Sequence, residues 1–168
     1  ESYTVTYLQK PVVIESRLGF EPAFTNQFEV LRTSNDTRSS QWTNAFGERR
    51  VVPDHYRELN VDLKHASGRL LRITFRAYDE GAALRYAFPE QDSKEFEFSN
   101  ERTEFRLPES TYGYEEHGTE GEYRRMRTAD FQPNCERPLT LEFASGLYAS
   151  LTEAANFGYP RMLLSPLG

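Results

Sequence analysis

Residues 59–88 read LNVDLKHASGRLLRITFRAYDEGAALRYAF, and apolar and polar side chains alternate within them. The alternation falls into three short segments, at 59–63, 71–78 and 84–88. Because successive side chains of a strand point to opposite faces, this pattern is typical of strands that are buried on one face. Ser67-Gly68 and Asp79-Glu80-Gly81 separate the segments and favour turns. The stretch therefore predicts a three-stranded antiparallel meander with one apolar and one polar face.

The central segment assigns individual side chains to the two faces. Leu71, Ile73 and Phe75 are predicted to be buried. Arg72 and Thr74 are predicted to lie on the opposite face. A different register of this strand would exchange the two sets.

The same signals predict strands along most of the chain. Further strands are expected at 2–8, 11–15, 26–32, 95–98, 102–107, 139–143 and 146–152. The chain has 10 Tyr and 12 Phe, and such aromatic side chains suit a pleated, half-buried surface. We therefore expect an all-β antiparallel sandwich that forms a single domain over residues 1–168.

Two stretches interrupt the strand pattern. Residues 34–50 are polar and are predicted to form a loop that Trp42 and Phe46 anchor. Residues 109–137 contain three glycines among clustered Tyr, Glu and Arg, and they are predicted to be irregular. A long irregular segment in a compact domain is frequently functional, and a surface excursion without a role is an equally good interpretation.

Composition excludes several classes of function. The net charge of −6 argues against nucleic acid as a partner, because phosphate neutralisation needs a basic face. Cys135 is the single cysteine, so no internal disulfide is expected, and the scattered histidines give no zinc pattern. No apolar run approaches the length of a membrane span. The chain begins at Glu1 without Met or a visible signal peptide, which suits a processed or trimmed protein.

Glu153 is the clearest candidate site residue. It follows Leu147, Ala149 and Leu151 at every second position, so a regular strand would point it toward the apolar side. A buried carboxylate needs a partner, since an isolated buried charge is very costly. An Arg, a metal ion or a second domain could be that partner, and carboxylate oxygens suit Ca²⁺. The alternative is that the strand ends at Leu151 and that Glu153 is solvated.

Tyr112, Tyr114 and Glu115 form a second candidate set, beside Glu116 and His117. Aromatic faces next to carboxylates are typical of sugar sites, so these residues are candidates for the rim of a substrate site. Two adjacent glutamates on an extended segment point to opposite faces and do not form the facing carboxylate pair of a glycosidase. A solvated acidic loop is the favoured interpretation of the two glutamates.

Four segments in order carry a family resemblance. They are Ser16-Arg17-Leu18-Gly19-Phe20, Tyr56-Arg57-Glu58-Leu59, the run FRAYDEGAALRY at 75–86, and Thr152-Glu153-Ala154-Ala155 followed by Tyr159-Pro160-Arg161-Met162. The third resembles the "fRaYndGvAfRY" run of the N-terminal domain of glycoside hydrolase family 97. The resemblance implies a β-supersandwich like that of galactose mutarotases, placed before a (β/α)₈ catalytic barrel. Because the family's domain continues with further strands, the sandwich is expected to be incomplete at its C-terminal end.

The resemblance also implies a function. The family's enzymes are exported, periplasmic or outer-membrane-associated bacterial proteins that depend on Ca²⁺ and act on α-glucosides or α-galactosides. Their catalytic residues lie on the barrel, so none is expected in this chain. Glu153 stands at the family's "EA" motif, which implies that it ligates Ca²⁺ in the complete enzyme. The chain alone would bind the ion weakly or not at all.

Two other functions compete with an accessory domain of a glycosidase. The first is a free-standing carbohydrate-binding or interaction module. The second is a mutarotase-like enzyme, which would need a His/Glu acid–base pair facing a cleft. His55, His65 and His117 lie in segments that offer no obvious pair of this kind, so this function ranks last. Fold analogy alone does not decide among the three.

Overall fold

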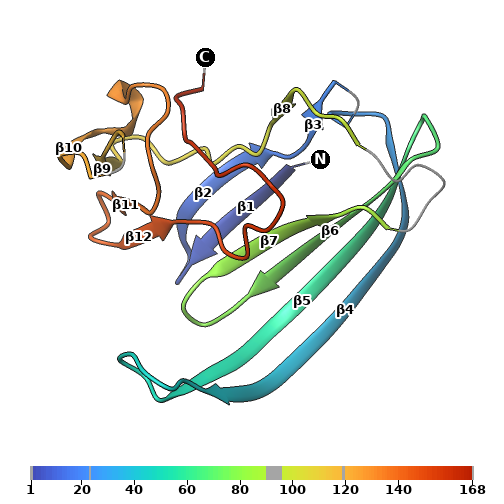
Figure 1. Ribbon diagram of the computed structural model, residues 1–168, viewed down its shortest axis with the longest axis horizontal. Coiled ribbons are helices and arrows are strands. Elements are labelled where there is room, and N and C mark those ends of the chain that lie inside the picture. The colour runs from blue at the N-terminus through green and yellow to red at the C-terminus, as the bar shows by residue number, and fades with distance from the viewer. Residues whose placement is uncertain (1, 23, 90–95, 119, 168) are drawn as a thin grey trace. The chain divides into compact units, whose positions relative to one another are not determined.

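The computed structural model describes residues 2–22, 24–89, 96–118 and 120–167. These residues form antiparallel strands and one short 3₁₀ turn, η1 (Thr128–Asp130), which confirms the predicted all-β antiparallel class (Figure 1). In this part of the chain no helix is long and apolar enough to cross a membrane. The chain divides into two compact units. The first unit is centred on Arg17–Thr103, and the second combines Ser2–Ser16 with Glu104–Gly168.

The first unit contains the predicted meander. Its main sheet has the order β4-β5-β6-β7. The strands are β4 (Phe28–Thr43), β5 (Val51–His65), β6 (Leu70–Ala77) and β7 (Ala82–Ala87). Leu59 pairs with Phe75, and Phe75 pairs with Leu84, so the apolar positions of three strands share one face. A two-stranded sheet of β3 (Phe20–Glu21) and β8 (Asn100–Glu101) completes this unit.

The apolar face of the meander is buried most deeply at one end. Leu63, Leu71 and Ile73 are buried there, beside a cluster of aromatic rings. The cluster consists of Phe20, Phe24, Phe28, His65, Tyr86, Phe88, Phe96 and Phe98. Phe75 is half-buried, so the prediction of its full burial is wrong. Its register is correct, and it lies two residues further along β6 than Ile73, nearer the end of the strand.

The opposite face carries the predicted polar side chains in paired rows. Arg72 Nε donates to Asp62 at 2.5 Å, and Thr74 Oγ1 donates to Asn60 at 2.6 Å. Thr74 is itself buried. The placement of Arg72 and Thr74 away from the core face is therefore confirmed, and their hydrogen bonds join neighbouring strands.

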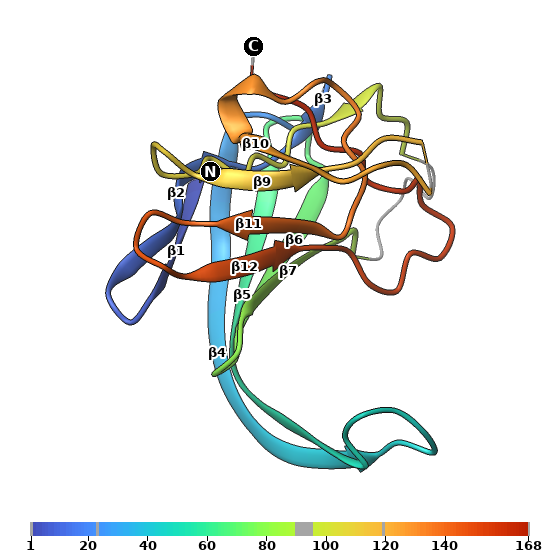
Figure 2. The ribbon, with the colours of Figure 1, turned by 90° about the vertical axis from the view of Figure 1, so that its left-hand side faces the viewer.

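Residues 34–50 do not form the predicted loop. β4 and β5 pair continuously to Thr43 and Val51, and residues 44–50 alone connect them. Because β6 pairs with β5 from Arg57 onward, the outer part of the hairpin has no third strand. Figures 1 and 2 show this ribbon extending beyond β6 and β7. Burial in this part of β5 alternates between exposed and half-buried side chains up to the buried Tyr56, but half-buried positions are occupied by polar residues such as Ser40 and Asp54, so the sequence lacks the apolar alternation that predicts strands. Trp42 and Phe46 are exposed and anchor nothing within the described residues.

The second unit contains a hairpin and a four-stranded sheet. The hairpin joins β1 (Ser2–Tyr7) and β2 (Lys10–Arg17). The sheet has the order β10-β9-β11-β12, with β9 (Tyr112–Glu115), β10 (Arg124–Arg127), β11 (Leu139–Glu142) and β12 (Tyr148–Leu151). Its core consists of Phe131, Cys135, Leu139, Leu141 and Phe143.

Most other predicted strands are present, and two are not. β1, β2, β11 and β12 confirm the strands expected at 2–8, 11–15, 139–143 and 146–152. Residues 102–107 and 96–98 are not in a strand, and residue 95 lies outside the described residues. The segment at 102–107 is instead joined to β2 by the hydrogen bond from Ile14 N to Arg106 O. The stretch 109–137 is partly regular, because it contains β9, β10 and η1.

Candidate functional site

Glu153 lies two residues beyond the end of β12. Leu151 and Glu153 are half-buried whereas Thr152 is exposed, so the alternation of β12 continues past the last ladder pair. The Glu153 side chain is 20% exposed, and its Oε1 accepts a hydrogen bond from Arg137 Nε at 2.6 Å. The strand ends at Leu151, as the alternative interpretation expected, but Glu153 is paired with Arg137 and is not fully solvated. Of the partners considered from the sequence, this chain supplies an Arg.

The pairing of β11 with β12 explains why Arg137 meets Glu153. Leu139 pairs with Leu151, and two residues further along both strands are Arg137 and Glu153. Directly opposed residues of opposite charge stabilise an antiparallel pair. The predicted hairpin therefore held a signal for this contact, because extending its register by two residues identifies Arg137.

Arg137 connects Glu153 to a longer row of alternating charges. Arg137 Nη1 lies 3.1 Å from Glu136 Oε2, and Arg161 Nη2 lies 2.8 Å from Glu136 Oε1. Glu136 is buried, and each of its two carboxylate oxygens has a charged partner. The row Arg161, Glu136, Arg137, Glu153 fixes the guanidinium that holds Glu153.

The remaining contacts of Glu153 leave one carboxylate oxygen available. The backbone N–H of Met162 donates to Oε1 at 2.9 Å and thereby closes the segment 154–161 into a loop. Asn156 Nδ2 also lies 3.5 Å from Oε1. All hydrogen bonds described for this side chain end on Oε1. Oε2 can therefore accept a further donor or bind a cation.

The surroundings of Glu153 do not form a complete metal site. The described ranges contain no group of three or more His, Cys, Asp or Glu side chains that could hold a metal ion. Calcium takes about six to eight oxygen ligands. The donor set near Glu153 fits calcium as a contribution of one carboxylate oxygen, and further ligands would have to come from another part of a larger protein.

Tyr112 and Tyr114 lie on one face of β9. The guanidinium of Arg125 lies 4.0 Å from the centre of the Tyr112 ring. Arg125 also donates two hydrogen bonds to Glu142, at 2.8 and 2.9 Å, and Tyr114 Oη donates to Glu142 at 3.4 Å. The Arg125 hydrogen bond holds the pKa of Glu142 below its ordinary value. The face therefore presents two half-buried aromatic rings beside a fixed ion pair.

Glu115 lies on the other face of β9, so the structure separates it from the two tyrosines. Glu115 is buried and accepts the N–H of Gln132 at 2.5 Å. His117 Nε2 lies 3.0 Å from the same carboxylate, and His117 Nδ1 donates to Asn134 O at 3.1 Å. The hydrogen bond to Glu115 raises the pKa of His117. The assignment of Tyr112, Tyr114 and Glu115 to a substrate rim stays a prediction.

The two adjacent glutamates are not a solvated acidic loop. Glu116 is buried like Glu115, and its Oε1 accepts the N–H of Gly121 at 2.7 Å. A Cβ at Gly121 would collide with His117 O, so this turn requires glycine. His117 and Glu115 form an ion pair, which is a different arrangement from an acid–base pair that faces a cleft. Its donors and acceptors are committed to the backbone at Gln132 and Asn134.

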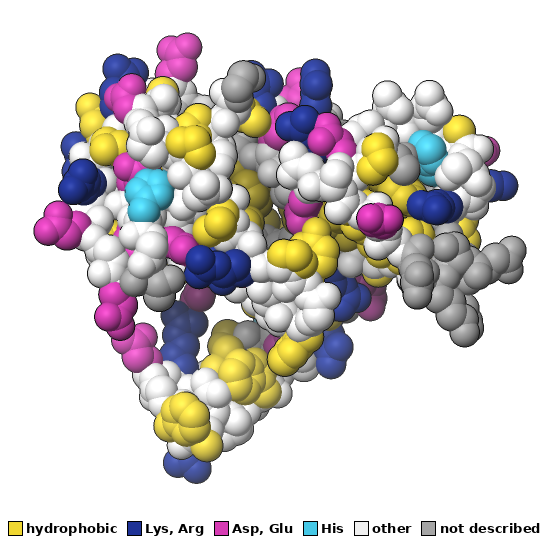
Figure 3. All heavy atoms as spheres, turned by 45° about the horizontal axis from the view of Figure 1, so that its top comes forward, with side chains coloured by type: hydrophobic (Ala, Val, Ile, Leu, Met, Phe, Trp, Pro, Cys, Tyr) yellow, Lys and Arg dark blue, Asp and Glu magenta, His cyan; other side chains and the backbone are white. Residues whose placement is uncertain are grey.

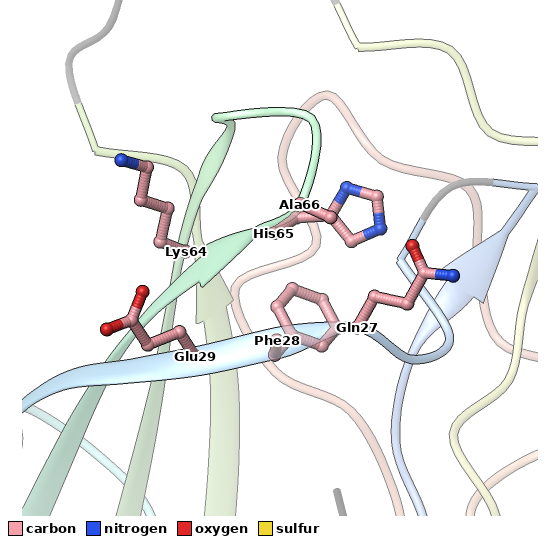
Figure 4. Close-up of a pocket in the computed structure, with 6 residues that line it drawn as sticks. All are labelled: Gln27, Phe28, Glu29, Lys64, His65 and Ala66. Carbon is pink, nitrogen blue, oxygen red and sulfur yellow. The ribbon is translucent and has the colours of Figure 1, made fainter.

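A separate pocket of about 380 Å³ lies in the first unit, where β4 begins and β5 ends. It is lined by Gln27, Phe28, Glu29, Lys64, His65 and Ala66 (Figure 4). The His65 ring packs against the Phe24 and Phe28 rings, and its Nδ1 lies 2.9 Å from Ser67 Oγ. His65 therefore belongs to the aromatic cluster. The lining holds one carboxylate, so it lacks the paired carboxyl groups that glycoside hydrolysis needs.

A family model described as glycosyl-hydrolase 97 N-terminal matches residues 1–166. The chain belongs to this family of N-terminal domains. Solved structures agree: a variant of a glycoside hydrolase family 97 enzyme from Pseudoalteromonas sp. strain K8 superposes with a TM-score of 0.87 and 26% identity. The match covers 99% of this chain and 27% of that chain. Structures of an enzyme of this family from the same strain, in complex with panose and with acarbose, match with the same values.

A β-arabinopyranosidase structure matches with a TM-score of 0.80 and 22% identity, over 89% of this chain and 27% of that chain. At this identity the match shows a shared fold alone. The chain thus spans about a quarter of the length of these solved enzymes.

Several residues that interact with the candidate site residues were not identified from the sequence. Arg137, Glu136 and Arg161 surround Glu153, and Arg125 and Glu142 accompany the tyrosines. All five of these residues belong to Arg–Glu ion pairs, for which the planar guanidinium of Arg is well suited. Composition could not say which side chains pair, because that depends on strand register.

Proposed function

We propose that this family 97 domain is the non-catalytic N-terminal part of an exported glycoside hydrolase that acts on α-glucosides or α-galactosides. The supporting observation is that the structural match covers 99% of this chain but only 27% of a homologous enzyme. A domain of this size leaves most of the enzyme, including its catalytic barrel, outside residues 1–168. The exported enzyme would work in the periplasm or at the outer membrane of a bacterium.

The chain contributes structure and binding to this enzyme. Its buried glutamates hold backbone N–H groups or guanidinium groups, as Glu115, Glu116 and Glu136 do. Carboxylates that are committed in this way cannot act as an acid and a base across a sugar. The catalytic carboxyl groups would therefore come from the barrel, while Tyr112 and Tyr114 offer aromatic surface to the active-site rim.

Glu153 would supply a ligand to a calcium ion. A bound calcium ion supplies a fixed positive charge that orients oxygen ligands around it. The domain's own part is to hold the carboxylate still, because Arg137 and the Met162 N–H fix Oε1. Oε2 then has a set direction, and the hydrogen bonds that the described residues make to Glu153 end on Oε1.

The test is calcium binding by the complete enzyme and its Glu153→Gln variant. Gln keeps an acceptor for the Met162 N–H but removes the carboxylate charge, so calorimetry should show weaker calcium binding. Activity should fall mainly at limiting calcium, and saturating calcium should restore part of it. The matched control is Glu142→Gln, which removes the charge of an Arg-paired glutamate in the same unit. Equal calcium affinity of the wild type and the Glu153→Gln variant would contradict the proposal.

The downstream sequence separates this function from its main alternative. A free-standing carbohydrate-binding module would lack a catalytic barrel after this domain and would bind an oligosaccharide by itself. The accessory domain requires the barrel. Sequencing the gene beyond the codon for Gly168 distinguishes the two.

A further inference from the structure

The outer hairpin of the first unit exposes a group of large apolar side chains. The ribbon tip, defined here as residues 42–51, contains Trp42, Phe46 and Val51, which are 52%, 89% and 49% exposed. Trp42 is the only Trp of the chain. Figure 3 shows hydrophobic side chains gathered on the lowest projection, where Figure 1 places the end of this hairpin. Exposed apolar groups that gather in one place are typical of contact sites.

The ribbon tip is held in one geometry. The N–H of Asn44 donates to Arg50 O at 2.8 Å, and Asn44 Nδ2 donates to Arg49 O at 3.3 Å. Arg49 also forms an ion pair with Glu80, in the turn between β6 and β7, at 3.0 Å. A contact surface that is fixed before binding loses little conformational entropy when it binds. The tip is therefore a better anchor than a flexible loop of the same composition.

The shape of the tip suits binding in a recess of a protein better than binding of a sugar. Trp42 pairs with Val52 and the next position, Thr43, pairs with Val51, so Trp42 and Val51 point to opposite faces of the ribbon. A sugar-stacking platform needs its aromatic faces on one side. A wedge with apolar groups on both faces fits a cleft lined by apolar side chains, and Arg49 supplies a polar rim.

We propose that the ribbon tip docks into the part of the parent polypeptide that lies outside residues 1–168, with Trp42 and Phe46 as its anchors. This inference rests on the proposed function, because it requires an enzyme that continues beyond this domain. Homologous enzymes have about three quarters of their chain outside the matched region. A partner in the same polypeptide is present at high effective concentration, so a small contact suffices. The contact would fix the orientation of the ribbon relative to the rest of the enzyme.

The direct test is photo-crosslinking in the complete enzyme with p-benzoylphenylalanine in place of Phe46. Mass spectrometry should identify an adduct, within one polypeptide, to a peptide that follows Gly168. The control places the same group at Leu8, which is 79% exposed in the turn between β1 and β2. An adduct to residues 2–167, a covalent dimer of two copies, or no adduct at Phe46 would each overturn the proposal.

Hydroxyl-radical footprinting provides a test without any substitution. Docking should reduce the oxidation of Phe46 in the complete enzyme well below the level that its free exposure predicts, because the centre of an interface excludes water. Leu8 should remain as reactive as its exposure predicts. Full reactivity of Phe46, or protection that appears only after acarbose is added, would overturn the proposal. Normal calcium affinity and activity in the same preparation would show that the proposed function itself is intact.

Discussion

Strands β4 and β5 pass through two different surroundings along their length. In the inner part they belong to a four-stranded sheet, and Leu63 is buried beside Leu71 of β6. In the outer part the same strands form a ribbon whose side chains pair at the surface, as Ser40 does with Asp54. Backbone pairing is continuous through both parts apart from one irregularity near Val30. Strand formation and burial are therefore separate properties of this hairpin, and substitutions should separate them.

The largest loss of stability is expected in the inner part of the sheet. Leu71 is 1% exposed. Leu71→Ala leaves a cavity in the core, so the free energy of unfolding should fall by about 2–5 kcal/mol. Urea unfolding followed by circular dichroism measures this change. An unchanged midpoint would contradict the placement of Leu71 in the core of the first unit.

A smaller loss is expected further along the same strand. Phe75 shares the face of Leu71 but is half-buried. Phe75→Ala should lower the free energy of unfolding by about 2 kcal/mol, less than the loss of about 3–5 kcal/mol for a fully buried Phe. The same urea series compares the two variants. If Phe75→Ala costs more than Leu71→Ala, burial does not decrease along β6 as described.

The same contrast explains which strands the sequence could predict. Alternation at Leu71, Arg72, Ile73 and Thr74 follows the apolar and polar faces of the inner sheet, so the meander was predictable. In the ribbon, half-buried positions are occupied by polar side chains such as Ser40 and Asp54, so its sequence shows no apolar alternation. Hydrophobic periodicity reflects burial, so it predicts a strand only where one face of that strand is buried by apolar side chains.

The candidate site, like the fold, could be predicted from the sequence only in part. The spacing from Leu151 to Glu153 left two interpretations open, a carboxylate on the apolar side with a partner or a solvated strand end, and the structure shows a half-buried carboxylate paired with Arg137. The identity of Arg137 required the register of β11 with β12, which the hairpin turn sets. Burial of Glu115 and Glu116 could not be predicted, because backbone N–H groups from Gln132 and Gly121 stabilise them.

The ion pair of His117 and Glu115, in the second unit, combines one buried and one partly exposed side chain. Its carboxylate is buried and its imidazole is half-exposed. Because the folded pKa of His117 is raised, its stabilising contribution is complete below the unfolded value of about 6.5 and is lost as the pH rises through the folded pKa. The unfolding midpoint should therefore fall modestly above pH 6.5.

The control for this pH dependence is His117→Gln, which should remove the slope in that pH range. A proton NMR titration of His117 measures its pKa directly. A titration midpoint at or below 6.5 would contradict a charged pair with Glu115.

The smallest effect is expected in the ribbon, where Ser40 and Asp54 are half-buried. Ser40→Ala removes the Ser40 hydroxyl, which donates to Asp54 at 3.1 Å, and should change the free energy of unfolding by less than about 0.5 kcal/mol. The matched substitution is Thr74→Val, which removes a hydroxyl from a buried position on the same polar face of the inner sheet. It leaves Asn60 without its donor and should cost about 1–2 kcal/mol. Water replaces the lost partner of Asp54 but reaches Asn60 less easily, so the two losses should differ by the effect of burial alone. Equal losses in urea unfolding would mean that the ribbon is as well covered as the sheet, and would sink the distinction between the two parts of the hairpin.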